Sequence, residues 1–532
     1  MRDSDLLKLN IVTGCRKGPR ECAWPPESSN KSTSSSKGGK QVETGTDSSE
    51  DEEEEEKEEK EEEVLLKVKS FTKDGIPTIV ERPSLTSLRT TNGTPNRSAM
   101  NTKRAAEYSK DKSMSPSATE STRPDSDLVS TCGHQSTVST NTSHEDILWS
   151  RLKQDQRFYL NYHQQSLSYC YYFLKQDFCC FTESILIDAA LTYEPLLHAV
   201  VGFSAFHYAL VHPGKNISSF LRHYNSGLSL LRKDLSSGRP HTDATIYTIL
   251  QLATFEEYLG DWANLRTHQK AACEIIKTLY TPETMMQTDT SRTLFAWYIR
   301  FDIFVGFMAG SETLIGIEWF QAYYDSTQRL TMMEPGKINY KLEALNAENR
   351  LLGMNMTMLF AKLPSGKITI AEFAEKNQML LQSIETWAEQ VRALRLNSDH
   401  LVYKFNNRRP LVSEDIVDPF EPGVIFDTTF FSANYMLMDC LALEVMHKMQ
   451  TSTILQLPPS PDLTDLSLQQ CQIFEAMQEY EGAPSGAFLP AQVNIGLVCL
   501  FVPRDDRHIS WCRKMLARFE NCGYVYDTYF NI

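Results

Sequence analysis

Two cysteines near the start of the chain are the residues whose types and spacing come closest to a site. Cys15 and Cys22 lie in the stretch GCRKGPRECAWPP, together with Arg16, Lys17 and Arg20. Neighbouring cations favour the thiolate form of cysteine, which is the form that binds Zn²⁺. The same cations are suited to contacts with DNA phosphates. We therefore predict that the two cysteines are metal ligands and that the three cations are phosphate contacts.

Motifs for catalysis and for phosphate binding are incomplete in this sequence. AKLPSGKIT (361–369) holds Gly366 and Lys367 but lacks the first glycine and the final Ser or Thr of a phosphate-binding loop. GFSAF (202–206) lacks the second glycine of a nucleophile elbow and lies within a helical pattern. We interpret the first stretch as a surface turn and the second as part of a helix. The sequence therefore predicts a protein that is not an enzyme.

Histidines and a cysteine pair give no further metal site. The histidines of 198–268 show neither a His-x3-His pair nor an adjacent carboxylate set, so we interpret them as structural or surface residues. They are His198, His207, His212, His223, His241 and His268. The adjacent Cys179 and Cys180 suit neither a CxxC redox site nor a zinc knuckle, and we expect them to pack.

The composition divides the chain at about residue 144. The 532 residues carry a formal net charge of −15, and the run EDEEEEEKEEKEEE (50–63) alone contributes −10. A domain that binds nucleic acid over its whole surface would be basic, so any DNA contact must come from a small module. We predict that 27–144 is a disordered Ser/Thr-rich and acidic linker. Its acidic run is either a solvated spacer or a segment that binds basic partners.

The cysteine pattern and the apolar runs predict a soluble intracellular protein. Twelve cysteines scattered over the chain do not form a disulfide framework, and Cys273 and Cys440 read as buried, reduced thiols. The first residues, MRDSDLLKLN, lack the apolar core of a signal peptide. The longest apolar run, 196–211, is too short to span a bilayer, so we expect no membrane association.

Helical periodicity continues from about residue 145 to the end of the chain. In 217–235, apolar residues recur every three or four positions and form one face, whereas Arg222, Lys233 and Asp234 lie elsewhere. The next helix is capped by Thr242 or Asp243 and ends at Gly260. Further helices are predicted at 264–280, 292–308, 340–362, 370–394, 427–450, 465–481, 488–501 and 508–521. The predicted fold is all-α, with one large helical domain at 145–532.

These helices resemble a known regulatory domain. The stretches YEPLLHAVVGFSAFHYALV (193–211), RHYNSGLSLLRKDL (222–235) and TILQLATFEEYLGDWANLRTHQKAACEII (248–276) are similar in order and spacing to core helices of the fungal-specific transcription factor domain. The stretches FAWYIRFDIFVGFMAGSE (295–312) and LFVPRDDRHISWCRKMLARFENCGYVYDTYF (500–530) resemble its later segments. The resemblance implies a helical regulatory domain that can also sense an effector, without an established catalytic site.

The opening stretch resembles the last third of the Zn2Cys6 cluster that accompanies such domains. The usual pattern is C-x2-C-x6-C-x5–12-C-x2-C-x6–8-C, and Cys15 and Cys22 match its fifth and sixth cysteines. Val12 stands where the fourth cysteine belongs, and no cysteine precedes it. Two thiolates leave a tetrahedral Zn²⁺ half-liganded. Residues 1–26 are thus predicted to be a remnant of the cluster, through loss of an upstream exon or through degeneration, and the intact CRKGPRECAWPP favours the first.

The resemblance implies a nuclear regulator of RNA polymerase II transcription. In a complete form it would bind Zn²⁺ and DNA through the cluster. It would contact the transcription machinery or co-regulators, and it could form a homodimer. Two alternatives stay open for the chain as written. One is an adaptor that lacks DNA binding and acts through protein partners, and the other is a helical protein that senses a ligand.

Overall fold

The computed structural model describes residues 144–176, 180–212, 218–396 and 398–525. All of them belong to one of the two units into which the chain divides. Within these residues the secondary structure is helical, apart from one isolated antiparallel bridge between Leu401 and Phe426. The all-α prediction is therefore confirmed. The predicted cluster remnant (1–26) and nearly all of the predicted linker (27–144) lie outside the described residues.

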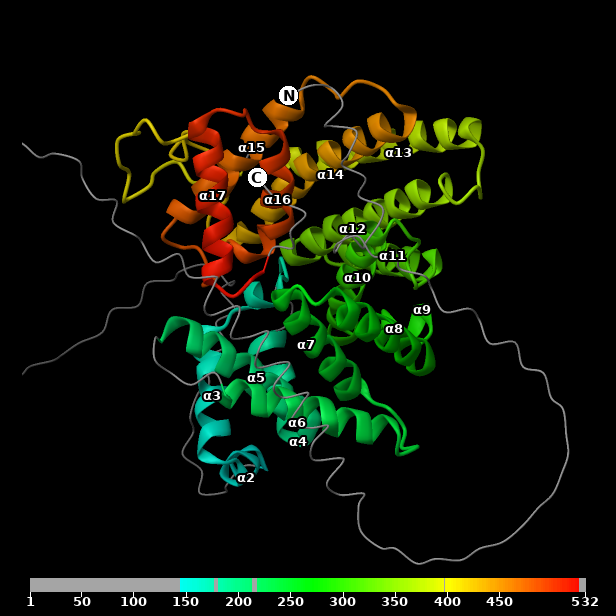
Figure 1. Ribbon diagram of the computed structural model, residues 1–532, viewed down its shortest axis with the longest axis vertical. Coiled ribbons are helices and arrows are strands. Elements are labelled where there is room, and N and C mark those ends of the chain that lie inside the picture. The colour runs from blue at the N-terminus through cyan, green and yellow to red at the C-terminus, as the bar shows by residue number, and fades with distance from the viewer. Residues whose placement is uncertain (1–143, 177–179, 213–217, 397, 526–532) are drawn as a thin grey trace, which may run out of the picture. The chain divides into compact units, whose positions relative to one another are not determined.

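Most helices follow one another with short connections, whereas a long irregular segment separates Ala393 at the end of α13 from Phe431 at the start of α14 (Figure 1). The first group comprises α2 (His144–Arg151), α3 (Gln154–Ser166), α4 (Leu186–Thr192), α5 (Glu194–Val211), α6 (Ser218–Leu235), α7 (Asp243–Leu259), α8 (Trp262–Leu279), α9 (Pro282–Met285), α10 (Asp289–Ala309), α11 (Ile317–Met333) and α12 (Ile338–Lys362). The second group comprises α13 (Ile370–Ala393), α14 (Phe431–Leu455), α15 (Leu463–Glu479), α16 (Gln492–Phe501) and α17 (Asp506–Asn521). Short helical turns are η2 (Tyr169–Tyr172), η3 (Phe181–Ile185), η4 (Thr428–Phe430) and η5 (Leu489–Ala491).

Local sequence signals set the helix ends. Thr242 and Thr245 form a capping box at the start of α7, and Gly260 ends that helix with a φ of +67°, a conformation that glycine adopts without strain. A second capping box joins Thr369 to Glu372 at the start of α13. Both ends predicted for the helix before Gly260 are thus confirmed. The helix α11 was not predicted.

The core is formed where consecutive helices pack as pairs, among them α5 with α6, α7 with α8, α11 with α12 and α14 with α15. The helix α5 is apolar around most of its circumference and is accordingly buried along most of its length. Trp297 on α10 is fully buried and lies between the rings of Tyr172 and Phe181. Burial of apolar surface at this scale is the main stabilising contribution to such a fold.

The helix α6 buries its apolar face and also one charged residue. Phe220, Leu221, Tyr224 and Leu231 are buried, and Arg222 is exposed, as predicted. Asp234 is buried instead of lying on the solvent face. Its carboxylate accepts a hydrogen bond from the Tyr193 hydroxyl at 2.6 Å and pairs with Arg239 at 2.7 Å. Burial of this carboxylate is therefore compensated by two specific partners.

Candidate functional site

The described residues do not include the predicted zinc ligands, Cys15 and Cys22. They do not include the predicted DNA phosphate contacts either, which are Arg16, Lys17 and Arg20. Within 144–176, 180–212, 218–396 and 398–525, no three His, Cys, Asp or Glu side chains come together as a metal site. A donor set of two thiolates does not fit the family's cluster, in which six thiolates share two ions. We derive no chemistry through zinc for this chain.

The two incomplete motifs occupy structural positions. Ser204 of GFSAF lies in the middle of α5, is fully buried, and donates its hydroxyl hydrogen to the carbonyl of Val200 at 2.8 Å. The stretch 363–369 is a largely exposed turn between α12 and α13, in which Gly366 has a φ of +69°. Both interpretations, as helix and as surface turn, are confirmed.

Cys273 and Cys440 have kept free thiols. Cys273 and Cys440 are buried, and burial raises the pKa of both. Cys180 is partly buried, whereas its neighbour Cys179 lies outside the described residues. The prediction of buried, reduced thiols at Cys273 and Cys440 is confirmed.

The structure brings two of the predicted histidines together. The Nδ1 atoms of His198 on α5 and His223 on α6 are 2.9 Å apart, so one ring donates to the other. Nε2 of His223 lies 3.4 Å from a carboxylate oxygen of Asp155 on α3. Burial lowers the pKa of both histidines, that of His223 to about 4. The cluster joins three helices as neutral rings, which agrees with a structural interpretation.

A cavity of about 160 Å³ is the feature of the described residues best suited to hold a ligand. Most of the residues that line it belong to α7, α10, α12, α14 and α16. One part of its wall is apolar and includes Ile303, Phe304, Phe307, Met356, Leu443 and Met446. Another part carries charge.

The charged wall contains two anchored carboxylates. Asp439 on α14 accepts hydrogen bonds from Lys175 at 2.5 Å, from Asn349 at 2.9 Å and from Asn494 at 3.4 Å. Glu257 on α7 pairs with Arg300 at 2.8 Å and accepts from Gln492 at 3.2 Å. Each carboxylate thus joins the first group of helices to α14 or α16.

Two arginines in this wall keep donors without partners. Arg300 on α10 is only 7% exposed, and it gives one nitrogen, Nη1, to Glu257. Its Nε and Nη2 atoms are buried and have no hydrogen-bond partner among the described residues. Nε of Arg350 on α12 is also buried without a hydrogen-bond partner among the described residues. Arg350 forms no ion pair with a described carboxylate. Buried donors without partners are rare, because each costs desolvation free energy.

The cavity therefore has an excess of positive charge. In their ordinary charge states, Lys175, Arg300 and Arg350 oppose only Asp439 and Glu257. Burial lowers the pKa of Lys175 and of Arg350, and each is further lowered by a neighbouring arginine. Burial raises the pKa of Glu257. An additional negative charge in the cavity would favour the charged forms of Lys175 and Arg350, whereas it would raise the pKa of Glu257 further.

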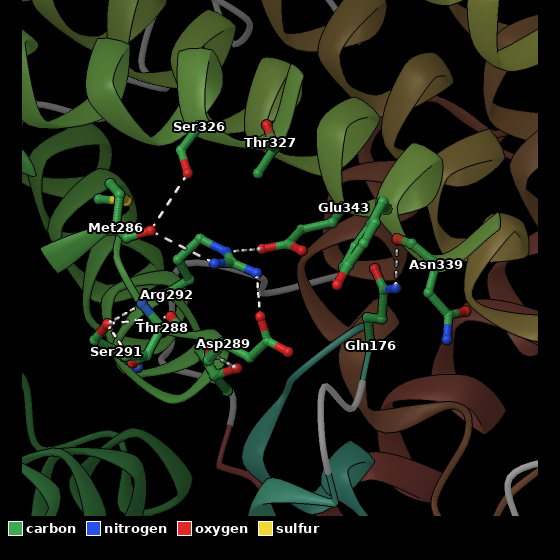
Figure 2. Close-up of polar contacts among 12 residues, drawn as sticks. Gln176, Met286, Thr288, Asp289, Ser291, Arg292, Ser326, Thr327, Asn339 and Glu343 are labelled. Carbon is green, nitrogen blue, oxygen red and sulfur yellow. Dashed lines mark hydrogen bonds and ion pairs between the residues drawn. The ribbon is translucent and has the colours of Figure 1, made fainter. Parts of the chain in front are cut away.

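A second buried arginine site on α10 shows what a satisfied guanidinium looks like in this protein (Figure 2). Arg292 donates from Nε to Glu343 at 3.0 Å, from Nη2 to Asp289 at 2.5 Å and from Nη1 to the carbonyl of Met286 at 3.5 Å. The same carbonyl accepts from the Ser326 hydroxyl at 3.4 Å. Every nitrogen of Arg292 has a partner, whereas two nitrogens of Arg300 have none.

Sequence reasoning missed the cavity because its charged residues are far apart in the chain. Lys175 and Asp439, for example, are separated by 264 positions. The one available signal is an arginine inside an apolar helical run, as in FAWYIRFDIF, where Arg300 interrupts the apolar face of α10. Such a residue is rarely buried without a partner.

Comparison with known families gives a match over part of the chain. The family described as "Fungal specific transcription factor domain" matches residues 158–359, which extend from α3 into α12. The predicted resemblance is confirmed over this range. No curated protein and no solved structure matches the chain. Among the described residues no helix is both long and apolar enough to cross a bilayer.

Proposed function

We propose that this chain is a fungal transcriptional regulator of the Zn2Cys6 type, which acts on RNA polymerase II transcription in the nucleus. The observation that carries the proposal is the match of 158–359 to a domain of fungal transcription factors. The helical body that contains this range supports a regulatory rather than a catalytic function. Its partners would be the transcription machinery or co-regulators.

DNA binding is the part of this proposal that depends on residues beyond Cys15 and Cys22. A complete cluster would supply zinc coordination and base contacts, and Arg16, Lys17 and Arg20 would add phosphate contacts. The two cysteines of this chain supply a third of the six thiolates. A form with all six is expected to bind DNA.

The regulatory part can be tested without the cluster. The full chain is fused to an unrelated DNA-binding domain and expressed with a reporter that carries the matching sites. We expect the fusion to change reporter transcription relative to the DNA-binding domain alone. A matched fusion with Trp297→Ala, which removes a fully buried side chain, should lose the effect. A wild-type fusion at normal level that leaves transcription unchanged would overturn the proposal.

A second candidate is an adaptor without its own DNA binding, which would act through its helical domain and through the acidic run of 50–63. Transcript mapping separates the two candidates. An in-frame upstream exon with four cysteines and a basic loop supports the DNA-binding regulator. If no such exon exists, and affinity purification of the chain recovers a DNA-bound transcription factor, the adaptor is supported.

A further inference from the structure

We propose that the cavity between α10, α12, α14 and α16 binds a small organic anion, whose carboxylate is held by Arg300 and Arg350 and whose short apolar part packs on the opposite wall. This inference concerns ligand binding by the folded chain. It does not require that the chain bind DNA or regulate transcription.

The cationic half of the site rests on the unpartnered donors. Arg300 and Arg350 line the cavity, and Nε and Nη2 of Arg300 and Nε of Arg350 are buried without hydrogen-bond partners among the described residues. A carboxylate accepts two parallel N–H hydrogen bonds from one guanidinium, and such charge-assisted bonds are among the strongest in proteins. A neutral ligand would satisfy donors but would leave the excess positive charge in place.

The carboxylates of the cavity do not compete for these donors. Both oxygens of Asp439 are taken by Lys175, Asn349 and Asn494. Glu257 is already paired with Arg300 through Nη1. Both oxygens of Asp439 are thus engaged, whereas Oε2 of Glu257 has an ion-pair contact with Nη1 of Arg300 at 2.8 Å but no hydrogen bond. Nε and Nη2 of Arg300 stay without a partner and are the donors left for an anion from outside.

The apolar half sets the size and character of the ligand. Phe304 and Phe307 of α10, Met356 of α12 and Met446 of α14 lie around the same cavity. Methionine side chains adapt to irregular ligands, and aromatic rings give flat apolar contact. A volume of about 160 Å³ has room for a monocarboxylate with a few carbon atoms.

A ligand in the cavity would contact two different parts of the chain. Arg300 and Arg350 lie within 158–359, the range that matches the family, whereas Asp439, Leu443 and Gln492 lie beyond it. A bound anion would contact both parts and would strengthen their packing, because a ligand that binds only the folded state stabilises it.

The test is a thermal unfolding measurement on the purified full chain. Sodium 3-methylbutanoate, 4-methyl-2-oxopentanoate, benzoate and acetate are added to about 10 mM at constant ionic strength. 3-Methylbutanamide, the uncharged isostere of the first, and sodium chloride are the ligand controls. We expect at least one of the apolar carboxylates to raise the melting temperature by about 2 °C or more. The amide and chloride should have no such effect.

Two variants assign the effect to the cavity. Arg350→Met removes an arginine without an ion pair and should abolish the carboxylate response, with the fold checked by circular dichroism. Arg395→Met is the matched control, since Arg395 also has a buried Nε without a partner but does not line the cavity. It should respond as the wild type does.

Two results would overturn the inference. One is that no carboxylate exceeds the amide and chloride, in which case the cavity holds only water. The other is that a folded Arg350→Met chain responds as the wild type does. Both results leave the proposed regulatory function standing, because the assay contains no DNA and no transcription.

Discussion

Arg292 on α10 and Glu343 on α12 form an ion pair of 3.0 Å in which the two side chains are only 4% and 3% exposed. Removing one member of such a pair leaves the other charge buried without compensation. We predict that Arg292→Met lowers the free energy of unfolding by about 3 kcal/mol or more, as measured by urea denaturation.

The double variant Arg292→Met/Glu343→Met should regain a large part of that loss, because neither charge is then left unpaired. Lys337 and Glu334 form an exposed pair, so Lys337→Met is the control and should change stability by less than about 1 kcal/mol. Equal effects of the buried and exposed variants would contradict the account.

The buried ring of His207 should make the folded chain less stable in mild acid. Its ring is buried among the rings of Tyr171, Phe203 and Tyr258, and burial lowers its pKa to about 3. In the unfolded chain the pKa is near 6.5, so below that pH the unfolded state binds a proton that the folded state does not. The contribution of His207 to the free energy of unfolding is therefore fully present above pH 6.5, and it is lost as the pH falls toward 3.

The measurement is the free energy of unfolding at pH 7 and at pH 5. His207→Phe should reduce the difference between the two by about 2 kcal/mol relative to the wild type. The control is His212→Phe, because His212 is exposed. An unchanged pH dependence in a folded His207→Phe chain would show that the ring is charged in the native protein.

Two glycines mark the close approach of α5 and α6. A Cβ at Gly202 would lie 3.2 Å from the backbone nitrogen of Tyr224, and a Cβ at Gly227 would lie 3.2 Å from that of Ala199. We expect Gly227→Ala to destabilise the fold by about 1–3 kcal/mol, although alanine favours helix. At Gly353 on α12 the nearest atom would be 3.6 Å away. Gly353→Ala should therefore be neutral or stabilising, and a similar loss at both positions would refute the packing argument.

Thiol reactivity should follow burial. Cys440 on α14 is buried and its pKa is raised, whereas Cys180 is only partly buried. We predict that iodoacetamide labels Cys180 on the order of tenfold or more faster than Cys440 in the native chain. Mass spectrometry of digests gives both rates, and denatured chain is the control, in which the two should converge. Equal native rates would mean that α14 opens readily.

Local signals in the sequence were sufficient for most helices and some of their ends. The helix of 243–259 was predicted from its Thr242 cap, its apolar spacing and Gly260, and the structure agrees. Ile317–Met333 is not predicted because the apolar part of its buried face, Trp319, Phe320 and Tyr323, covers little more than one turn and polar residues continue that face. No side chain caps its start, which follows Gly316. Its burial depends on α12, which the local sequence does not reveal.

The cavity lay beyond sequence reasoning for a related physical reason. The charge of Asp234 was placed on the solvent side of its helix, although Tyr193 and Arg239 bury it. In the same way Arg300 and Arg350 become cavity residues only when α10 and α12 pack against α14 and α16. Periodicity identifies a helix face, but the partners of a buried charge are decided by tertiary contacts.

The most direct measurement of the central claim, that this chain regulates transcription, is RNA sequencing of cells that lack the chain, together with chromatin immunoprecipitation of a tagged copy. We predict that a limited set of transcripts changes, that wild-type chain restores them, and that the tagged protein is found at their promoters. Unchanged transcripts and no enrichment on chromatin, with the tagged protein present at normal level, would contradict the claim.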